Sequence, residues 1–425
     1  MSRTPSAFPP SLRRLAPLAA AAALLCAASA GMAQQTLSSV QTSNGVVSGT
    51  VNNVLGPNGV QSNTFGSTST AITSNALSST GLGNEADKTL IVNNQPPATP
   101  TVYVQQTVDA AVSGTTNTKI GIDTTGTTAG NTGGRTNAQG VVSNNTAQST
   151  AKGNTDKARL NVNSNSPLTV GSTASAFTIQ DLNAPVTATT SAPALVGINL
   201  LPRGGAWNNL ALTVQNNQLG AAAFGNQSTT GVGVNAAGAM TLAAPVTSTV
   251  VQTQSGAVGA STSAGTVGIA IANNLLTTLV QPANSAFTVD GNGVNASAQG
   301  NQLVNTTQVD ASTLAQSGTG LVQSTSNQSA SAGSSATSLA GFVGVNNTKP
   351  VSSGNDYTVS GNTVGADASG NLGTSTAGVG SAAAPVSTIR PAALKNARIS
   401  QSTECTGLRE RMVMAPEATV ITAKR

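Results

Sequence analysis

Short stretches of alternating apolar and polar residues, separated by Gly and Asn, run through most of the chain. In YTVSGNTVGADASGN, which begins at Tyr357, apolar side chains alternate with polar ones before each of the two Gly-Asn pairs. A period of two residues is typical of a strand that buries one face, and Gly and Asn tolerate the positive φ of tight turns. The stretch therefore predicts a strand, a turn, a second strand and a second turn.

This pattern recurs at a nearly constant interval. LTVQNNQLGAAAFGN begins at Leu212, FTVDGNGVNASAQGN at Phe287, and weaker copies begin at Thr70 and Gly140. A second marker, written IGID, VGIN, VGIA or VGVN, keeps step with the first. About five imperfect units of about 72 residues indicate a tandem repeat architecture.

The small size of the inward-facing residues indicates how the units pack. Ala recurs at alternating positions of the motif, which leaves room only for a close opposing wall. Stability must then come from stacked backbone hydrogen bonds, as in an all-β solenoid, that is, a parallel β-helix. With roughly 20 to 24 residues in a coil, each unit would hold about three or four coils and the body would form a rod about 70 Å long.

Asn recurs at the turns of the motif, and two roles are open for it. Asn forms turns readily, and this role needs no further function. If the coils stack in register, the same amides would form ladders of side-chain hydrogen bonds along the solenoid. The candidate turn or ladder residues are Asn216, Asn226, Asn292, Asn301, Asn362 and Asn371.

Composition changes at both ends of the repeats. Residues 1–33 combine an Arg-containing start, a short apolar stretch and a small-residue cleavage site, which predicts a secretory signal peptide and an exported protein. We expect residues 34–69 to form an irregular first unit or cap, and residues 70–389 to form the solenoid body. Residues 390–425 hold ten of the 31 charged residues and no copy of the motif, which predicts either a polar cap on the open end or a segment that docks a partner protein.

Charge and composition exclude several classes of function. The pI is about 9.6, yet residues 34–389 carry eight basic and ten acidic residues, so the body offers no basic surface for nucleic acid. The chain has no His, and Cys405 is the one Cys beyond the predicted signal peptide, so we expect no metal site, no disulfide framework and no cofactor. The acidic residues are scattered rather than paired, so we expect no catalytic residues and no enzyme activity.

No second apolar stretch of membrane length follows the predicted signal peptide, so we expect no transmembrane segment. A protein of this kind stays on a cell only if another protein holds it. Trp207 is the only Trp and lies in the loop-like stretch LLPRGGAWNN, near Arg203. Two roles are open for its ring, namely contact with a sugar by stacking, or packing of the loop onto the solenoid.

The ASAQGN, ADASGN and AAAFGN segments, together with the Ala-rich export signal and the overall length and layout, resemble the holdfast anchor protein D family, or a related bacterial surface adhesin of β-strand repeats. The resemblance implies a protein of the cell surface, associated with the outer membrane through a partner, that helps to fasten an adhesive polysaccharide to the envelope. It also implies two protein partners, a curlin-like surface subunit and an outer-membrane lipoprotein resembling the curli secretion channel. No catalytic or binding residue is carried over from it.

Two other functions remain open beside this structural and adhesive one. A curlin-like amyloid fibre or biofilm matrix subunit would stack its coils end to end, although the charged tail favours a closed rod. An ice-binding solenoid would present Thr-x-Thr at the same place on successive coils, and we find no fixed spacing of such segments in the sequence. The abundance of uncharged Thr, Ser, Asn and Gln favours many weak hydrogen bonds to a matrix polysaccharide.

Overall fold

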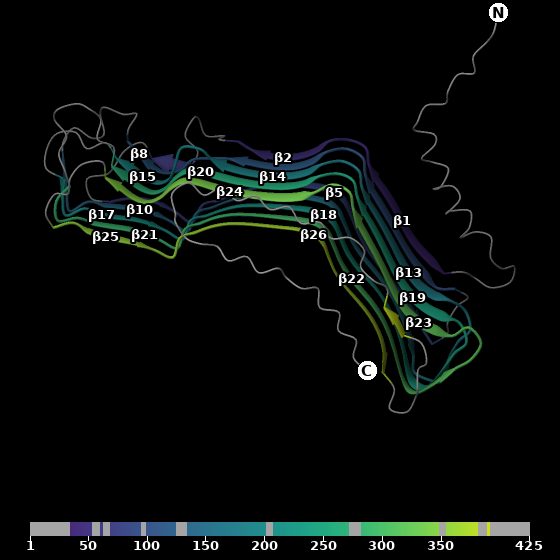
Figure 1. The fold of residues 1–425 in the computed structure, drawn as a ribbon. Coiled ribbons are helices and arrows are strands. Elements are labelled where there is room, and N and C mark those ends of the chain that lie inside the picture. Colours follow the sequence, from purple (N-terminus) through teal and green to yellow (C-terminus); the bar gives the residue numbers. More distant parts are fainter. Residues whose placement is uncertain are drawn as a thin grey trace, which may run out of the picture.

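A computed structural model describes residues 35–52, 60–62, 69–94, 99–124, 134–200, 207–271, 282–347, 354–380 and 389–391. In this part of the chain the regular structure consists of parallel β-strands that stack into a solenoid, without a helix (Figure 1). No helix long and apolar enough to cross a bilayer occurs among these residues. The all-β solenoid predicted from the repeats is confirmed.

One sequence unit forms one coil of the solenoid. Ala151 pairs with Ala223, and Ala223 pairs with Ala298, so each strand lies beside its counterpart in the next sequence unit. The expectation of several short coils in each unit is therefore wrong, because each coil runs along two long walls before the chain returns to its starting point. With about 4.8 Å between stacked coils, the five coils rise only about 24 Å, and the long dimension of the molecule lies within each coil (Figure 1).

In every coil the chain first follows the wall that lies on the outside of the bend in Figure 1, which we call the convex wall. One of its two sheets contains β1 (Thr36–Ser43), β6 (Thr101–Val108), β13 (Ala174–Leu182), β19 (Pro245–Gln254), β23 (Leu321–Ala330) and β27 (Ile389–Pro391). The other contains β2 (Val47–Val51), β7 (Val112–Asn117), β14 (Val186–Ala192), β20 (Val258–Ile271) and β24 (Ser334–Asn347), with the shorter β3 (Val60–Ser62), β8 (Ile120–Asp123) and β15 (Val196–Leu200).

The chain then returns along the concave wall on the inside of the bend. Its short sheet contains β4 (Ser69–Thr73), β10 (Gln139–Ser143), β17 (Ala211–Gln215), β21 (Ala286–Asp290) and β25 (Asp356–Ser360). Its long sheet contains β5 (Ala76–Asn93), β11 (Thr146–Ser164), β18 (Gln218–Leu242), β22 (Gly293–Gln316) and β26 (Thr363–Gly380), with β12 (Leu168–Val170) beside β18. The short strands β9 (Arg135–Thr136) and β16 (Trp207–Asn208) pair separately.

Each coil passes from the short sheet to the long sheet through a turn residue with positive φ. The φ values at this turn lie between 54° and 65°, at Ser74, Asn144, Asn216, Gly291 and Gly361. Gly and Asn enter this left-handed region more easily than other residues. The Gly and Asn of the motif therefore place the same turn in successive coils.

The second sequence marker forms a column of glycines on the convex wall. Gly121, Gly197, Gly268 and Gly344 have φ between 134° and 147°. A Cβ atom on Gly197 would lie 1.9 Å from the carbonyl oxygen of Gly268 in the next coil. Backbone geometry, rather than a ligand, therefore requires this marker.

The two walls enclose a thin core. Three apolar clusters follow one another along the coil, and layers of buried polar side chains separate them. The middle cluster is built from small side chains such as Ala151, Ala188 and Ala223, as the motif predicts. Trp207 and Phe287 belong to the cluster at the end that contains the short sheet.

The described part of the first unit is more regular than expected. β1 and β2 pair in register with β6 and β7, so residues 36–51 form the beginning of the first coil rather than an irregular cap. At the other end, β27 pairs with three residues of β23. The predicted signal peptide, Cys405 and residues 392–425 of the predicted tail lie outside the described residues.

Candidate functional site

A ladder of Asn side chains crosses all five coils at the turn between the short and long sheets. In each step the Nδ2 of one Asn donates to the Oδ1 of the Asn in the next coil, over 2.8 to 2.9 Å. The same Oδ1 accepts the backbone N–H of the first Asn. The members of this turn ladder are Asn75, Asn145, Asn217, Asn292 and Asn362.

The candidates Asn292 and Asn362 thus lie in the turn ladder, but Asn216 does not. Asn216 is the exposed turn residue with φ 54°, and its neighbour Asn217 provides the buried amide of the ladder. The two adjacent Asn residues make the sequence ambiguous by one position. Alignment of the repeats resolves this ambiguity, because Val214 pairs with Val289 and Asn217 then takes the place of Asn292.

A second Asn ladder, which we call the wall ladder, lies within the long sheet. Its amides are linked over 2.8 to 2.9 Å, and its members are Asn84, Asn154, Asn226, Asn301 and Asn371. The remaining Nδ2 hydrogen reaches across the core. Asn226, for example, donates to the carbonyl oxygen of Thr253 on the convex wall over 3.0 Å. The candidates Asn226, Asn301 and Asn371 all belong to this ladder.

A Gln ladder extends from the convex wall toward the wall ladder. Its steps measure 2.8 to 2.9 Å, and its members are Gln41, Gln106, Gln180, Gln252 and Gln328. Gln252 Nε2 also donates to the carbonyl oxygen of Gln302 on the concave wall over 2.9 Å. The two walls are therefore joined by amides from both sides. The recurrence of Gln at the length of the repeat is the sequence signal for this ladder, which the Gly-Asn motif did not reveal.

The wall ladder and the Gln ladder are structural features. Asn226, Asn301 and Gln252 have no exposed surface, and their amide hydrogens are bonded to protein atoms. Buried amides with satisfied hydrogen bonds hold a core in one register and do not contact a ligand. Ligand-binding positions are therefore to be found on the outward faces of the strands.

Asp156 is a buried carboxyl group close to the wall ladder. Its Oδ2 accepts a hydrogen bond from Thr178 over 3.0 Å, whereas its Oδ1 has no hydrogen-bond partner among the described residues. Burial raises the pKa of Asp156 to about 7, and hydrogen bonds from Ser228 and Thr178 oppose this rise. The same position holds Ala86 and Leu303 in other coils. Because this carboxyl group is buried and the position holds no carboxyl group in these other coils, Asp156 affects the stability of the fold rather than ligand binding.

Trp207 does not have the exposure that stacking on a sugar requires. Its side chain is 0% exposed and lies in the same apolar cluster as Leu210 and Phe287. The sugar-contact role is therefore wrong, and packing onto the solenoid describes this residue. Arg203, its neighbour in the sequence, lies outside the described residues.

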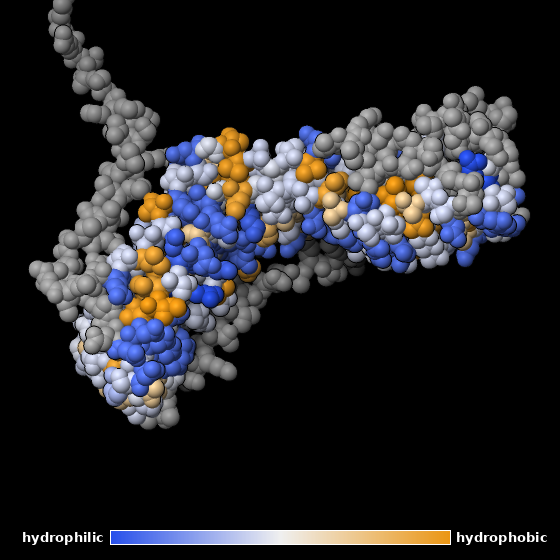
Figure 2. Space-filling model, turned by 180° about the vertical axis from the view of Figure 1, so that it is seen from behind, coloured by the Kyte–Doolittle hydropathy of each residue, from blue (hydrophilic) through white to orange (hydrophobic). Residues whose placement is uncertain are grey.

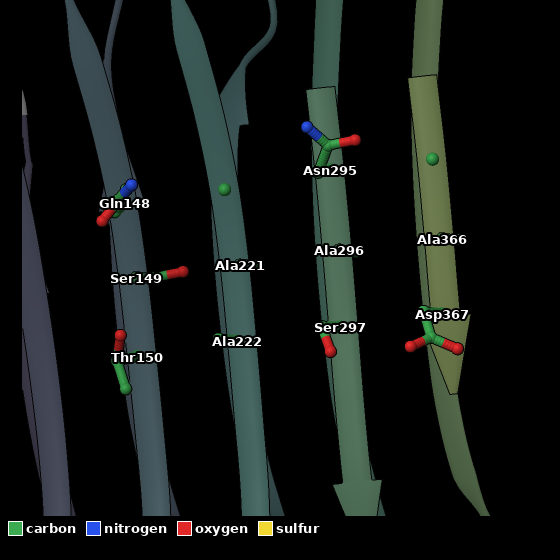
Figure 3. Close-up of a pocket in the computed structure, with 12 residues that line it drawn as sticks. Gln148, Ser149, Thr150, Ala221, Ala222, Asn295, Ala296, Ser297, Ala366 and Asp367 are labelled. Carbon is green, nitrogen blue, oxygen red and sulfur yellow. The ribbon is translucent and has the colours of Figure 1, made fainter. Parts of the chain in front are cut away.

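The outer surface of the concave wall is hollowed into a shallow trough of about 500 Å³. The trough crosses β11, β18, β22 and β26, so four successive coils contribute to it (Figure 3). Its outward-facing polar side chains are Gln148, Thr150, Asn295, Ser297 and Asp367, whereas Ser149, which also lines it, is buried. Amide, hydroxyl and carboxylate groups alternate across it and offer both donors and acceptors to a ligand rich in hydroxyl groups.

Small residues at outward positions make the trough hollow. Gly220, Ala222 and Gly365 occupy positions at which larger side chains would fill the space between the polar groups. A Cβ atom on Gly220 would lie 3.6 Å from Cγ of Gln148, which is ordinary van der Waals contact. The backbone at Gly220 therefore tolerates a side chain, and the open floor is a property of this sequence rather than of the fold.

Phe224 lies at the next outward position of β18, two residues beyond Ala222. Its ring is partly exposed, and Nζ of Lys152 lies 5.9 Å from the ring centre, within the range of a cation–π contact. Phe224 therefore supplies, beside the trough, the accessible aromatic surface that Trp207 lacks. The alternation in AAAFGN is the sequence signal for this exposed ring, because it places Phe224 on the face opposite to the buried Ala residues.

The outer face of the convex wall carries two parallel rows of hydroxyl groups. One row contains Ser48, Ser113, Thr187 and Ser335, with Gly259 in the fourth coil, and the other contains Thr50, Thr115, Thr189, Ser261 and Thr337. Strand geometry separates the rows by about 6.6 Å and the coils by about 4.8 Å. Among these strands only β14 carries Thr at both positions, as Thr187 and Thr189, so Thr-x-Thr itself does not recur on successive coils, as expected. The rows arise because Ser takes the place of Thr in the other coils.

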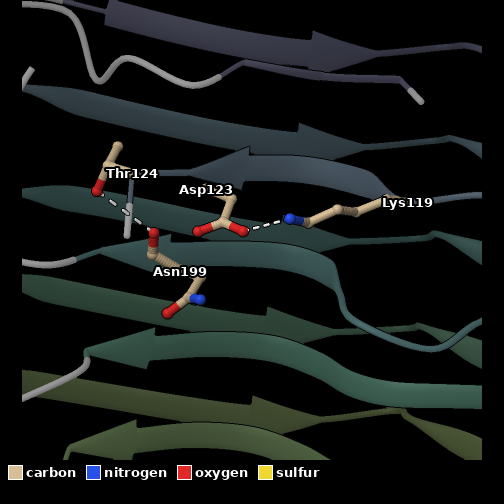
Figure 4. Close-up of polar contacts among 4 residues, drawn as sticks. All are labelled: Lys119, Asp123, Thr124 and Asn199. Carbon is tan, nitrogen blue, oxygen red and sulfur yellow. Dashed lines mark hydrogen bonds and ion pairs between the residues drawn. The ribbon is translucent and has the colours of Figure 1, made fainter. Parts of the chain in front are cut away.

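Charged side chains are sparse on the described surface. Lys119 and Asp123 form an ion pair across β8, and Thr124 Oγ1 donates to the carbonyl oxygen of Asn199 over 3.5 Å (Figure 4). The two side chains lie on one segment of the chain and neutralise each other's charge. Within the described ranges, no group of three Cys, Asp or Glu residues is close enough to hold a metal ion.

The trough and the hydroxyl rows therefore face opposite sides of the molecule and differ in shape. The trough is concave, with amides, one carboxylate and a nearby aromatic ring, whereas the hydroxyl rows form a regular array on a sheet surface. Both arise from outward positions of strands whose inward positions build the core. No protein-family model, curated protein or solved structure matches this chain.

Proposed function

We propose that this is an exported structural or adhesive protein of the bacterial cell surface, which helps to hold an adhesive polysaccharide on the envelope. The observation that carries the proposal is the trough on the concave wall, where four coils combine amides, hydroxyls and Asp367 beside the partly exposed ring of Phe224. Hydrogen-bonding groups next to an aromatic face fit the polar edges and apolar faces of sugar rings.

The surface outside the trough also suits a long uncharged ligand. Figure 2 shows hydrophilic and hydrophobic residues gathered into separate columns that cross the coils. A polysaccharide lying across the coils would meet similar side chains about every 4.8 Å, and many weak contacts along one chain reinforce each other. Because few of these contacts involve charges, we expect binding to change little with salt concentration.

Retention on the cell requires protein partners in this proposal. The resemblance to holdfast anchor proteins supplies two candidates, a curlin-like surface subunit and an outer-membrane lipoprotein resembling the curli secretion channel. The predicted tail, residues 390–425, is the candidate docking segment, with the polar cap as its alternative role.

A matched pair of substitutions tests the trough. Gly220→Gln fills the trough, whereas Gly259→Gln adds the same side chain to the outer face of the convex wall. A Cβ atom on Gly259 would meet no atom closer than 3.8 Å, so the backbone there tolerates a side chain as it does at Gly220. The readout is retention of the protein, from Gln34 onward, on beads of cellulose, dextran and alginate. We expect Gly220→Gln to abolish retention and Gly259→Gln to leave it intact. Equal behaviour of the two variants, or loss of wild-type retention at high salt, would contradict the proposal.

Deletion of the gene tests the anchoring role in the cell. The measurement scores separately how much adhesive polysaccharide is made and how much of it stays on the cells. We expect polysaccharide to be made and then shed into the medium. Unchanged attachment of the polysaccharide would contradict the anchoring role, independently of the retention measured on beads.

The hydroxyl rows favour ice binding as a second candidate function. Regular hydroxyl groups on a sheet surface can match the repeat of oxygen atoms in an ice surface, and Thr189 and Ser261 lie in register at such a site. The test is thermal hysteresis with the same two variants. Ice binding predicts activity in wild type and Gly220→Gln and its loss in Gly259→Gln, which is the reverse of the polysaccharide result. Absence of hysteresis in the wild-type protein excludes this candidate.

A further inference from the structure

On the concave wall the two ends of the solenoid present strand edges of the same form. At the amino-terminal end, β4 has 5 residues and β5 has 18. At the carboxyl-terminal end, β25 has 5 residues and β26 has 18. Both pairs bend at a residue with positive φ, Ser74 at 59° and Gly361 at 62°. Because each edge is a copy of the same part of the coil, one edge has the shape that would continue the other.

The last coil leaves open two positions that are core in the coil before it. Val359 is 52% exposed, whereas Val289, its partner in the preceding coil, is 0% exposed. Tyr357 stacks on Phe287 at 5.1 Å and remains 37% exposed on its other side, whereas Phe287 is 1% exposed. At the opposite end, Ile72 occupies the same column as Val359 and is only partly buried. A further coil laid on either end would cover these side chains.

The turn ladder also ends with complementary groups. Within each interior step an Asn Nδ2 donates to the Oδ1 of the next coil. At the last coil, Asn362 Nδ2 donates to the carbonyl oxygen of Val289, which leaves its second hydrogen without an Asn in a following coil. At the first coil, Asn75 donates to Asn145, and no described residue donates to Asn75 Oδ1. One end therefore offers the donor, and the other the acceptor, of the same hydrogen bond.

Charges would not oppose this pairing. In the register of the interior coils, Asp367 of β26 falls in the column of Thr80, and Leu372 falls in the column of Glu85. No acidic residue of one edge would thus face an acidic residue of the other at these columns. Like charges directly opposite each other would otherwise destabilise the pair of strands.

We propose that copies of this chain stack head to tail, with β25 and β26 of one copy paired in register with β4 and β5 of the next. In this register β1 of the next copy takes the place beside β23 that β27 holds in the single chain, so β27 leaves β23 when the copies stack. Val359 then packs on Ile72 of the next copy, and Asn362 continues the turn ladder to Asn75. The occupant of each end is a second copy of this chain, because a second copy alone reproduces strand lengths, bend, core column and ladder together. This assembly is independent of polysaccharide binding and would exist without it.

A charge placed at the proposed junction tests the assembly. Sedimentation velocity of the chain from Gln34 onward is measured over a wide range of concentrations. We expect wild-type protein to form linear assemblies that lengthen with concentration, and Val359→Lys to weaken them about tenfold or more, because the junction would bury an unpaired charge. Val304→Lys is the matched control. Val304 is 45% exposed on β22, one coil in from the end strand β26, so a Lys there does not lie at the junction and should leave assembly unchanged.

Cross-linking tests the register. Ala71→Cys and Thr358→Cys lie in one outward column, so a short bismaleimide should join them between neighbouring copies. Both proteins also carry Cys405→Ser, and the linked dimer should form in their mixture and not in either protein alone. A wild-type chain that is monomeric at every concentration overturns the proposal. Assembly that appears only after removal of residues 392–425 overturns it equally, because the tail would then be the occupant of the end.

Discussion

Phe224 and Asn226 lie two residues apart on β18, yet they face different surroundings. Phe224 points outward beside the trough, and Asn226 is buried in the wall ladder with both amide hydrogens bonded. Gly225, between them, is also buried, so the strict alternation breaks at this point. One six-residue segment, AAAFGN, therefore contributes to the core and to the candidate site at once.

The comparison shows which positions are free to change. Inward positions must satisfy neighbours in two adjacent coils and in the opposite wall, so their side chains recur or stay small. Outward positions have neighbours only along the sheet, so Lys152, Phe224 and Gln299 follow one another in a single column. Stability should therefore depend on the inward face and ligand binding on the outward face.

Removal of an aromatic ring from each face gives the largest expected contrast. Phe287→Ala leaves a cavity in the end cluster and should lower the free energy of unfolding by about 3–5 kcal/mol. Phe224→Ala removes a partly exposed ring and should lower it by about 1 kcal/mol or less. Urea denaturation measures both values. Equal losses would show that the two faces do not differ as described.

The buried carboxyl group of Asp156 should make the free energy of unfolding depend on pH, whereas an exposed carboxyl group on the outward face should not. The folded pKa of Asp156, about 7, lies above its ordinary value of 3.8. The stabilisation of the protonated form is then present below about pH 4 and is lost as pH rises to about 7. Asp156→Asn should remove this dependence and raise stability at pH 7 by on the order of 3–4 kcal/mol. Thermal unfolding at pH 4 and pH 7.5 measures it, with the exposed Asp367→Asn as control. A wild-type stability that does not change between these pH values contradicts the assignment.

Replacing one buried and one exposed Asn should give a smaller difference in stability between the two faces. Asn226→Ala removes the acceptor of one Asn154 Nδ2 hydrogen and the amide that donates to Asn301 Oδ1 and to the carbonyl oxygen of Thr253. It should lower stability by about 2–3 kcal/mol. Asn235→Ala removes an exposed amide that donates to Asn163 over 3.1 Å, and should change stability by about 0.5 kcal/mol or less. The midpoint of chemical denaturation reports both. A costly Asn235→Ala would mean that exposed amide pairs also hold the coils together.

Local chemistry made the strands, the turns and the repeat predictable from the sequence. Alternation and the positive φ of Gly and Asn act within a few residues, and the candidates Asn292 and Asn301 could be placed for this reason. The length of a coil could not be predicted in the same way, because alternation marks the faces of a strand but not the point at which the chain closes on itself. The choice between the two roles of Trp207 stayed open in the sequence, because its neighbours resemble a loop and the core that encloses it comes from distant parts of the chain.

The candidate site was less accessible to prediction than the ladders. The trough depends on the absence of side chains at Gly220, Ala222 and Gly365, which become neighbours only when whole sequence units stack as single coils. The Gln ladder was missed because its members stand outside the Gly-Asn motif. Once the coil length is known, both follow from reading the sequence in columns rather than along the chain.

The size of the coil has a consequence for how the molecule folds. Partners in the ladders between neighbouring coils lie a whole sequence unit apart, so no inter-coil hydrogen bond can form until a complete coil has been laid down. Closing a loop of about 72 residues rather than about 22 raises the entropic barrier by about 1 kcal/mol for the first contact. Folding should therefore start slowly, at one completed pair of coils, and then proceed quickly, because each further coil is added to an existing template. For an exported protein, as proposed above, this slow start would keep the repeats unfolded while they cross the envelope.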